Sequence, residues 1–183
     1  MIKRLVITGY KAHELGIFND KHPGIGIIKK ALEDRLTPLL DNGLEWVIVS
    51  GQPGVETWAA ETVIDLQDTF PDLKFAVITP FQEQEKNWNE AKQEAYQFIL
   101  AHADYSVSLT KRPYEAPWQF IERDKFLLRN SDGILIVYDE ENDYYVCEVN
   151  LDEDEMGRFL RGTVNACPYY QSDDEYRIVR RQM

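Results

Sequence analysis

Short apolar runs alternate along the chain with longer segments in which apolar residues recur every three or four positions. Runs of the first kind favour buried strands, and segments of the second kind favour helices that bury one face. The runs predict five strands, at Leu5–Ile7, Trp46–Val49, Phe75–Ile78, Tyr105–Leu109 and Ile134–Tyr138. The spacing predicts four helices, at Ile25–Asn42, Val55–Phe70, about Asn87–Ala103 and about Trp118–Asn130.

This order of elements predicts a single α/β domain over residues 1–183. Near-continuous apolar strands that alternate with helices favour a mostly parallel central sheet covered on both faces. Right-handed crossovers then give a Rossmann-like three-layer sandwich, in which ligands bind beyond the carboxyl ends of the strands. The segment from Tyr10 to Gly24 has no clear period, so we expect a long loop there.

The pattern weakens from Glu140 onward, and residues 140–183 form an acidic C-terminal segment of uncertain structure. This segment holds eleven acidic and five basic residues, which supplies half of the chain's net charge of −12. A short helix around Asp152–Leu160 and a strand around Tyr176–Val179 are the elements that it suggests.

The composition narrows the classes of function. The excess of negative charge disfavours nucleic acid, because nonspecific binding depends on Lys and Arg contacts with phosphates, and it disfavours anionic membranes. Cys147 and Cys167 are isolated, which fits a reducing cytosol. No apolar run has the length of a signal-peptide core or a transmembrane span, and the histidines and cysteines lack the spacing of a metal site. We therefore expect a soluble cytoplasmic protein without a metal ion.

The segment from Val47 to Glu56 carries the strongest functional signal. An apolar run stops at Ser50, a Gly51-Gln52-Pro53-Gly54 turn follows, and a helical pattern begins at Val55. Such a turn places backbone N–H groups and the positive end of a helix dipole at the carboxyl edge of the sheet, where phosphates bind. The same residues are also typical of an ordinary structural turn between a strand and a helix, so both interpretations stay open.

Several neighbours of this turn are candidates for contact with a ligand. Glu56 lies in the first helical turn, where it either compensates the helix dipole or faces a ribose or an attacking water. Gly9, at the end of the first strand, would let a ligand approach the backbone. Tyr10 is placed to stack on a base and Lys11 to meet a phosphate, although a turn glycine beside a surface lysine is the simpler interpretation.

Cations also follow the fourth strand and enter the last helix. Arg112 could clamp a phosphate through two hydrogen bonds, and Arg123 is expected near the same edge of the sheet. For each of them alone, a solvated salt bridge is the simpler interpretation in so acidic a chain.

Several stretches together resemble the YpsA-like family of uncharacterised Gram-positive bacterial proteins. The resemblance covers about residues 2–141, and its segments are Ile7–Lys11, Glu14–Phe18, Gly43–Trp46, Ser50–Glu61, Ile78–Phe81, Glu83–Trp88, Arg112–Glu115 and Ser131–Gly133. The family looks like part of the superfamily that joins DprA-type DNA-processing proteins and LOG-type cytokinin-activating enzymes. Members of that superfamily share a Rossmann-like fold with a glycine-rich nucleotide or phosphate site after the second strand. The resemblance therefore implies a pocket lined by Gly51, Gln52, Gly54 and Glu56 together with Gly9 and Tyr10.

Two departures limit what the resemblance implies. The LOG-type Pro-Gly-Gly-x-Gly-Thr-x-x-Glu pattern sets its Glu four residues beyond the last Gly, whereas Glu56 is two beyond Gly54, with Val55 in place of the Thr. The local pattern is closer to the DprA-type Ser-Gly…Gly-Ile-Asp, but DprA-type binding of single-stranded DNA needs basic surface. Relatives also continue after Tyr138-Asp139 with a Gly-Ser-Pro-like loop, which Asp143–Cys147 replaces here.

Three hypotheses of function follow. The first, which favours binding over catalysis, is a cytosolic sensor or regulatory protein for a nucleotide, NAD or an ADP-ribose-like ligand. The phosphate of the ligand would lie on the turn from Gly51 to Val55, its base or ribose near Tyr10 and Glu56, and Arg112 would clamp it. The second is a nucleotide N-glycosidic hydrolase of LOG-like type, with Glu56 as its catalytic group. The third is a DprA-like module for single-stranded nucleic acid. A homodimer is expected only from the family resemblance.

Overall fold

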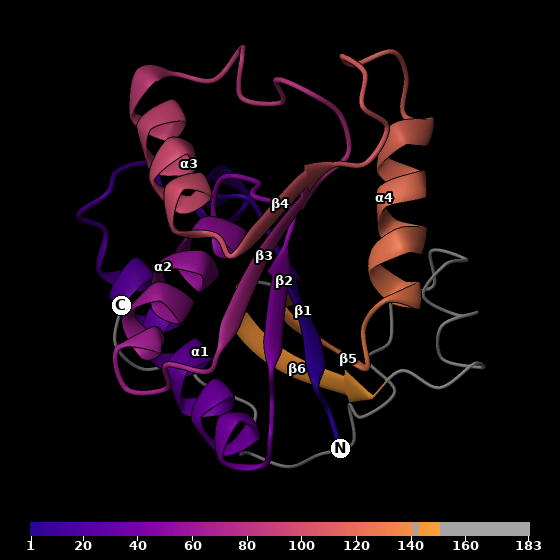
Figure 1. Cartoon of the computed structure of the whole chain (residues 1–183). Coiled ribbons are helices and arrows are strands. Elements are labelled where there is room, and N and C mark those ends of the chain that lie inside the picture. Colours follow the sequence, from indigo (N-terminus) through magenta and orange to yellow (C-terminus); the bar gives the residue numbers. More distant parts are fainter. Residues whose placement is uncertain (141–142, 151–183) are drawn as a thin grey trace.

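A six-stranded sheet forms the centre of the computed structural model, which describes residues 1–140 and 143–150 (Figure 1). The strands are β1 (Arg4–Gly9), β2 (Trp46–Val49), β3 (Lys74–Thr79), β4 (Tyr105–Ser108), β5 (Gly133–Glu140) and β6 (Asp143–Asn150). They lie in the order β4-β3-β2-β1-β5-β6. Strands β1 to β5 run parallel, and β6 pairs antiparallel with β5.

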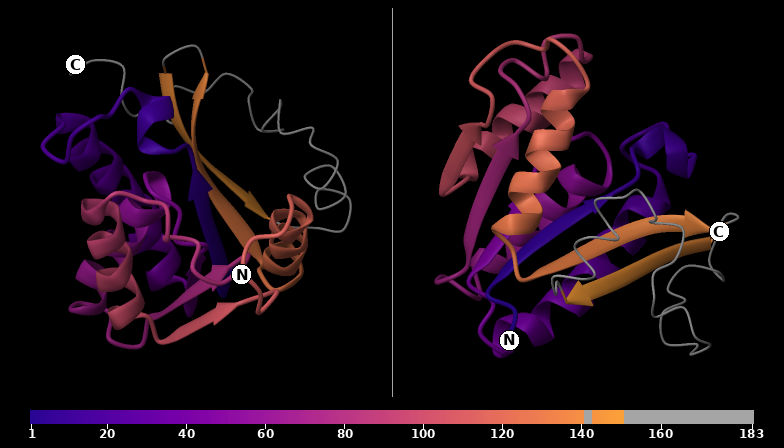
Figure 2. Two further views of the ribbon diagram at one scale, coloured as in Figure 1. Left: turned by 90° about the horizontal axis from the view of Figure 1, so that it is seen from above. Right: turned by 90° about the vertical axis from the view of Figure 1, so that its right-hand side faces the viewer.

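Helices cover the sheet on both faces. They are the short 3₁₀ helix η1 (Ala12–Leu15) and the α-helices α1 (Pro23–Asp41), α2 (Val55–Gln67), α3 (Glu90–His102) and α4 (Trp118–Arg129). Helices α1, α2 and α3 lie against one face and α4 against the other (Figures 1 and 2). This arrangement confirms the predicted Rossmann-like α/β fold. Within the described ranges, no helix is both long and apolar enough to cross a membrane.

The helix starts show how the local sequence sets these bounds. The Nδ1 atom of His22 accepts the N–H of Gly24 at 3.1 Å, and the side chain of Asn89 accepts the N–H of Lys92 at 3.0 Å, so α1 and α3 each begin with a side-chain cap. Helix α2 begins after Gly54, which offers no side chain to its first N–H groups. The N–H groups in the first turn of α2 have no partner within the helix and no side-chain cap, so their acceptors must come from elsewhere.

The nine predicted strands and helices are all present, with ends that differ by up to three residues. The predicted loop from Tyr10 to Gly24 is wrong in part, because it contains η1 and the first residues of α1. The helix predicted to reach Phe70 ends at Gln67, before the tight turn that leads to β3.

Strand β6 is the one described strand that the sequence pattern does not predict. Its register runs from Glu140 opposite Asp143 to Gly133 opposite Asn150. Aromatic and β-branched residues within β6 are typical of strands, but the acidic residues around them hide the signal. The predicted helix at Asp152–Leu160 and strand at Tyr176–Val179 lie outside the described residues.

Two apolar cores hold the layers together. The larger core lies between the sheet and α1, α2 and α3, and the smaller core lies between the sheet and α4. Leu5 and Ile7 of β1 contribute to the larger core, whereas Val6 between them contributes to the smaller one. Because successive side chains of a strand point to opposite faces, a strand buried on both faces reads as a continuous apolar run.

Asp132 fastens the start of β1 to the start of β5. Its carboxylate accepts the backbone N–H groups of Lys3 at 3.1 Å and Arg4 at 2.9 Å, and it pairs with the Arg4 guanidinium at 2.8 Å. The N–H of Asp132 donates in return to the carbonyl of Arg4 at 2.8 Å. These contacts, above all the hydrogen bond from the Arg4 side chain, hold the pKa of Asp132 below its ordinary value.

We predict that Asp132→Asn lowers the free energy of unfolding by about 1–2 kcal/mol at neutral pH, because an amide replaces a charged acceptor. A carboxyl group with a lowered pKa in the fold stabilises it above the unfolded-state pKa of about 4, and this contribution is lost as the pH falls through the folded-state pKa. The difference between wild type and variant should therefore shrink below about pH 4.

Urea unfolding at neutral and acidic pH measures this effect. The exposed Asp72 provides the control, since Asp72→Asn should change the free energy of unfolding by less than about 0.5 kcal/mol. A difference between wild type and Asp132→Asn that does not vary with pH would contradict the assigned role of the carboxylate.

Candidate functional site

The carboxyl ends of β1 and β2 meet the start of α2 at one edge of the sheet. Between β2 and α2 the chain turns through Gly51 and Gly54, whose φ angles are 77° and 109°. The strand order reverses at β1, which has β2 on one side and β5 on the other. In doubly wound sheets, ligands bind outside the carboxyl ends of the strands at such a switch point. The glycine turn therefore borders the usual ligand crevice of this fold.

The Glu56 side chain folds back from the first turn of α2 into the glycine turn and is only 7% exposed. Its Oε2 accepts the N–H of Ser50 at 2.9 Å, the N–H of Gln52 at 3.2 Å and the Ser50 hydroxyl at 2.6 Å. Its Oε1 accepts the Thr8 hydroxyl at 3.0 Å. Four donors thus offset the cost of burying this charge. The carboxylate holds the turn together from inside, beyond the dipole compensation expected from its position.

Arg123 brings α4 into the same constellation. Its Nη1 donates to the Ser50 hydroxyl oxygen at 3.1 Å, and its Nε and Nη2 donate to Asp124 at 2.9 and 2.6 Å. The guanidinium lies 5.4 Å from the centre of the Phe120 ring, and the Arg123 side chain is 14% exposed. A fixed, mostly buried cation therefore stands beside the Ser50–Glu56 pair.

Gln84, in the segment after β3, holds the turn from another side. Its Nε2 donates to the Ser50 carbonyl at 2.9 Å, and its Oε1 accepts the Gln52 side-chain amide at 2.8 Å. Tyr96 of α3 hydrogen-bonds to Gln84, and its ring fills the space into which a Cβ on Gly51 would project. Burial raises the pKa of Tyr96 to about 12. The turn is thus held by polar contacts from Gln84, in the segment that follows β3, and is covered by the Tyr96 ring of α3.

Gly54 lies directly against the backbone that follows β1. The Tyr10 carbonyl accepts the N–H of Val55 at 3.2 Å, so this segment supplies one of the partners that α2 lacks at its start. A Cβ on Gly54 would lie 2.5 Å from the Ala12 nitrogen and 2.8 Å from the Lys11 Cα. The glycine is therefore required by close packing of two backbone segments as well as by its positive φ.

The three residues predicted to contact a ligand after β1 have different surroundings. A Cβ on Gly9 would meet the Val137 carbonyl and the Val55 side chain, so the packing of β1 requires glycine at this position. Tyr10 is 36% exposed and Lys11 is exposed, and both belong to the segment that crosses the glycine turn.

Three backbone N–H groups at the start of α2 lack a hydrogen-bond acceptor among the described residues. The N–H groups of Gly54, Glu56 and Thr57 donate to no acceptor among the described residues, and Gly54 and Glu56 are buried. Buried N–H groups without a partner are rare in native proteins. These donors lie at the positive end of the α2 dipole, a position at which anions bind in other proteins.

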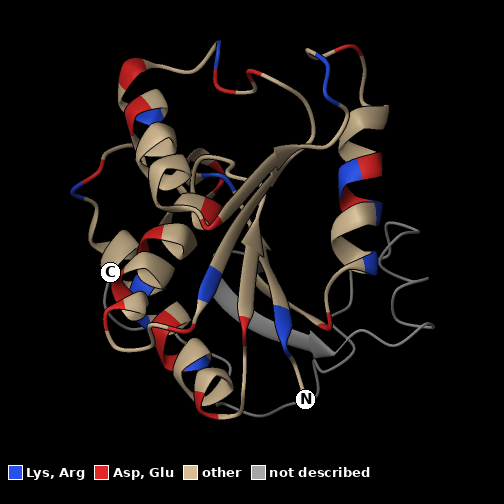
Figure 3. Ribbon diagram, in the orientation of Figure 1, with Lys and Arg blue, Asp and Glu red and all other residues tan. Residues whose placement is uncertain are grey.

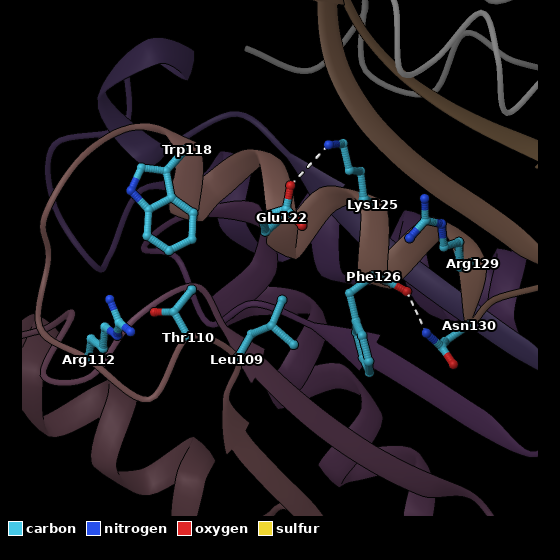
Figure 4. A pocket seen from close by; sticks show the side chains of 9 residues that line it. All are labelled: Leu109, Thr110, Arg112, Trp118, Glu122, Lys125, Phe126, Arg129 and Asn130. Atoms are coloured by element: carbon cyan, nitrogen blue, oxygen red, sulfur yellow. Dashed lines mark hydrogen bonds and ion pairs between the residues drawn. The ribbon is translucent and has the colours of Figure 1, made fainter.

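Arg112 lies apart from this constellation. Its side chain is exposed, pairs with Glu115 at 3.6 Å and lines a depression beside α4 next to Trp118 (Figure 4). None of the residues that line this depression belongs to the glycine turn. The cation that reaches Ser50 is instead Arg123, and no spacing in the sequence distinguishes it from the other cations near this edge.

These features define a doubly wound α/β domain with a glycine turn, a buried carboxylate and free helix N–H groups at the switch point of its sheet. Among the described residues, no three His, Cys, Asp or Glu side chains are grouped to hold a metal ion. A family model described as the YspA SLOG family matches residues 5–155. The chain therefore belongs to the YpsA family, as its sequence motifs imply.

Individual proteins that are similar to this chain support the same assignment to a family. The UPF0398 protein of Lysinibacillus sphaericus is 70% identical over 138 residues, which covers 75% of this chain and 77% of that protein. The UPF0398 protein YpsA of Bacillus subtilis is 56% identical over 142 residues, which covers 78% of this chain and 79% of that protein. A UPF0398 protein of Bacillus licheniformis is 46% identical over 188 residues, which covers 93% of this chain and 100% of that protein.

The C-terminal part of the chain matches a second family model. This model, described as a domain of unknown function (DUF6472), covers residues 132–183. It overlaps the YpsA model over residues 132–155, a range that includes β5 and β6.

We predict that Gly54→Ala lowers the free energy of unfolding by about 3 kcal/mol or more, because it combines a strained backbone angle with a clash against backbone atoms. Gly26→Ala is the matched control, since Gly26 is an exposed residue inside α1 with nothing near the position of a Cβ. This control should stabilise the protein by about 0.5–1 kcal/mol. Equal effects of the two substitutions in urea unfolding would contradict the close packing at Gly54.

We predict that Glu56→Gln lowers the free energy of unfolding by about 2–3 kcal/mol, because an amide turns one acceptor into a donor among four donors. Glu61→Gln on the same helix removes a partly exposed charge that pairs with Lys29 at 3.2 Å, and it should cost less than about 1 kcal/mol. Chemical denaturation of both variants measures the contrast. A cost for Glu56→Gln as small as that for Glu61→Gln would show that the carboxylate does not hold the turn.

Proposed function

We propose that the protein binds a nucleotide or a nucleotide derivative, such as NAD or ADP-ribose, as a sensor or regulator. The observation that carries this proposal is the set of free N–H groups of Gly54, Glu56 and Thr57 at the positive end of the α2 dipole. Phosphate groups bind at such helix starts in Rossmann-like folds. The resemblance to superfamily members with a phosphate site after the second strand supports the same position.

The hydrogen bonds of the turn restrict how a phosphate would bind. The N–H groups of Ser50 and Gln52 already serve Glu56, so a phosphate would meet the N–H groups further along, at the start of α2. The Glu56 carboxylate would repel a phosphate, and the fixed guanidinium of Arg123 provides the compensating charge. In this proposal Arg123 takes the role that the sequence pattern suggested for Arg112.

The remaining parts of the ligand would lie over the segment that follows β1. The partly exposed Tyr10 ring offers a surface on which a base can stack. The Oε1 atom of Glu56 accepts one bond, from Thr8, among the described residues, so it has capacity to accept a ribose hydroxyl. Contacts of this kind would favour a nucleotide over a simple phosphate.

The same carboxylate supports a second candidate function, which is hydrolysis of the N-glycosidic bond of a nucleotide. Four donors fix the position of Glu56, and a fixed carboxylate can orient a water or stabilise a developing ribosyl cation. Release of free base from a nucleoside monophosphate would establish this reaction. Binding without release of base would favour the sensor.

A titration with nucleotides, NAD and ADP-ribose, followed by heteronuclear NMR and by melting temperature, tests the site. We expect the amide signals of Gly54, Glu56 and Thr57 to shift and the melting temperature to rise. Lys11→Gln and Arg123→Gln should each weaken binding about tenfold through the loss of a charge-assisted contact. Lys30→Gln, the same charge change on the exposed face of α1, should leave the affinity unchanged.

The location of the shifts decides the outcome. Ligand-induced shifts confined to residues away from the start of α2 would overturn the proposal, as would equal losses of affinity in Lys11→Gln and Lys30→Gln. Gly54→Ala is unsuitable as a binding control, because its effect on packing would change the turn itself.

A further inference from the structure

We propose a second ligand site, on α4, for a small organic anion that carries a flat ring. It lies in a depression of about 410 Å³ between α4 and the chain that leaves β4 (Figure 4). Pockets for small molecules start at volumes of this order. The site is separate from the glycine turn, and its existence does not depend on the function proposed above.

One stripe of α4 forms a wall of this depression. Trp118, Glu122, Phe126 and Arg129 follow one another at intervals of four, four and three residues, so they share one side of the helix. Arg123 is absent from this wall and contacts Ser50 instead. Helix α4 therefore presents one stripe to the glycine turn and another to the depression.

The apolar part of the depression suits a flat ring. The Trp118 side chain is 41% exposed although it is one of the largest apolar groups of the chain. Its indole lies across from Leu109 and Thr110, and the Phe126 ring continues the wall along the helix (Figure 4). Aromatic rings bind other rings by offset or edge-on stacking. An exposed indole beside an open depression thus provides a stacking surface.

The charged part of the depression suits an anion. Arg112 lies at the end beside Trp118, and Arg129 lies at the other end (Figure 4). Between them Lys125 pairs with Glu122 at 2.9 Å, so the lining carries more positive than negative charge. Within the described residues, Arg129 has neither an ion pair nor a side-chain hydrogen bond, and the contact of Arg112 with Glu115 is long and exposed.

Two features distinguish this group of cations from an ordinary charged surface. The chain carries a net charge of −12, and acidic residues lie along the helices on the other face of the sheet (Figure 3). Lys125 and Arg129 are four residues apart on one helix, where like charges repel each other. The dipole at the C-terminal end of α4 favours a cation at Arg129, but it explains neither Arg112 nor the exposed Trp118. A ligand whose ring stacks on Trp118 and whose anionic group binds the neighbouring Arg112 accounts for both of these residues.

The ligand that this chemistry recognises has a ring against Trp118 and a phosphate or carboxylate on Arg112. A nucleoside monophosphate and an aromatic carboxylate both have these two parts. Guanidinium groups bind phosphates and carboxylates through paired hydrogen bonds, so both sources fit the arginines. The volume of the depression is of the size that a single small molecule occupies.

The indole N–H signals of the four tryptophans provide a direct test by heteronuclear NMR. Trp118→Phe assigns the signal of Trp118, which is then followed in titrations with adenosine monophosphate, indole-3-acetate, adenosine and inorganic phosphate. We expect one or both of the ring-bearing anions to shift this signal, and adenosine and inorganic phosphate to bind at least about tenfold more weakly. A shift with only one of the two anions identifies the source of the ligand.

Variants separate this site from the glycine turn. Arg112→Gln combined with Arg129→Gln should weaken the binding reported by Trp118 at least about tenfold. Lys30→Gln combined with Lys86→Gln, an equal change of charge at exposed positions, should not. Lys11→Gln should leave the Trp118 response intact. The proposal is overturned if neither ring-bearing anion shifts the Trp118 signal, or if the shift survives in the double arginine variant.

Discussion

The buried carboxylate of Glu56 is the interaction on which the edge of the sheet depends. It takes donors from the end of β1, from the end of β2 and from the glycine turn, so a single side chain of α2 joins three segments. A buried charge that loses a partner is costly, and each of these donors is therefore held firmly in place. Arg123 and Gln84 then attach to the same Ser50 from α4 and from the segment after β3. The turn is therefore tied by hydrogen bonds to four separate segments of the chain.

The hydrogen bonds of Glu56 also decide which backbone N–H groups of the turn remain without a partner. The Glu56 carboxylate accepts the N–H groups of Ser50 and Gln52, which a phosphate would otherwise meet first. The N–H groups at the start of α2 remain without an acceptor among the described residues. The segment after β1 adds a further constraint, because its backbone lies on Gly54 and its carbonyl holds Val55. A ligand at this edge would therefore meet a preformed surface, and little ordering entropy would oppose its binding.

The sequence was sufficient to predict the layers but not the contacts at the site. Strand burial on both faces and helical spacing are local patterns, and they locate β1 to β5 and α1 to α4 to within three residues. The position of Glu56 in the first turn of α2 is equally local. Its partners are not, because Thr8 lies 48 residues away and Arg123 reaches Ser50 across 73 residues. A local sequence pattern does not report contacts between distant segments. The sequence therefore could not show that Arg123, and not Arg112, contacts the glycine turn.

The direction of β6 has a consequence for how this protein can change during evolution. Because β6 runs antiparallel to β5, it ends with Asn150 opposite Gly133, at the amino end of the sheet. The glycine turn lies at the carboxyl end, so the chain leaves β6 on the side away from the candidate site. The two family models overlap across this hairpin. Residues added or lost after β6 therefore begin at the edge of the sheet opposite the glycine turn, where they leave the contacts of Glu56 unchanged.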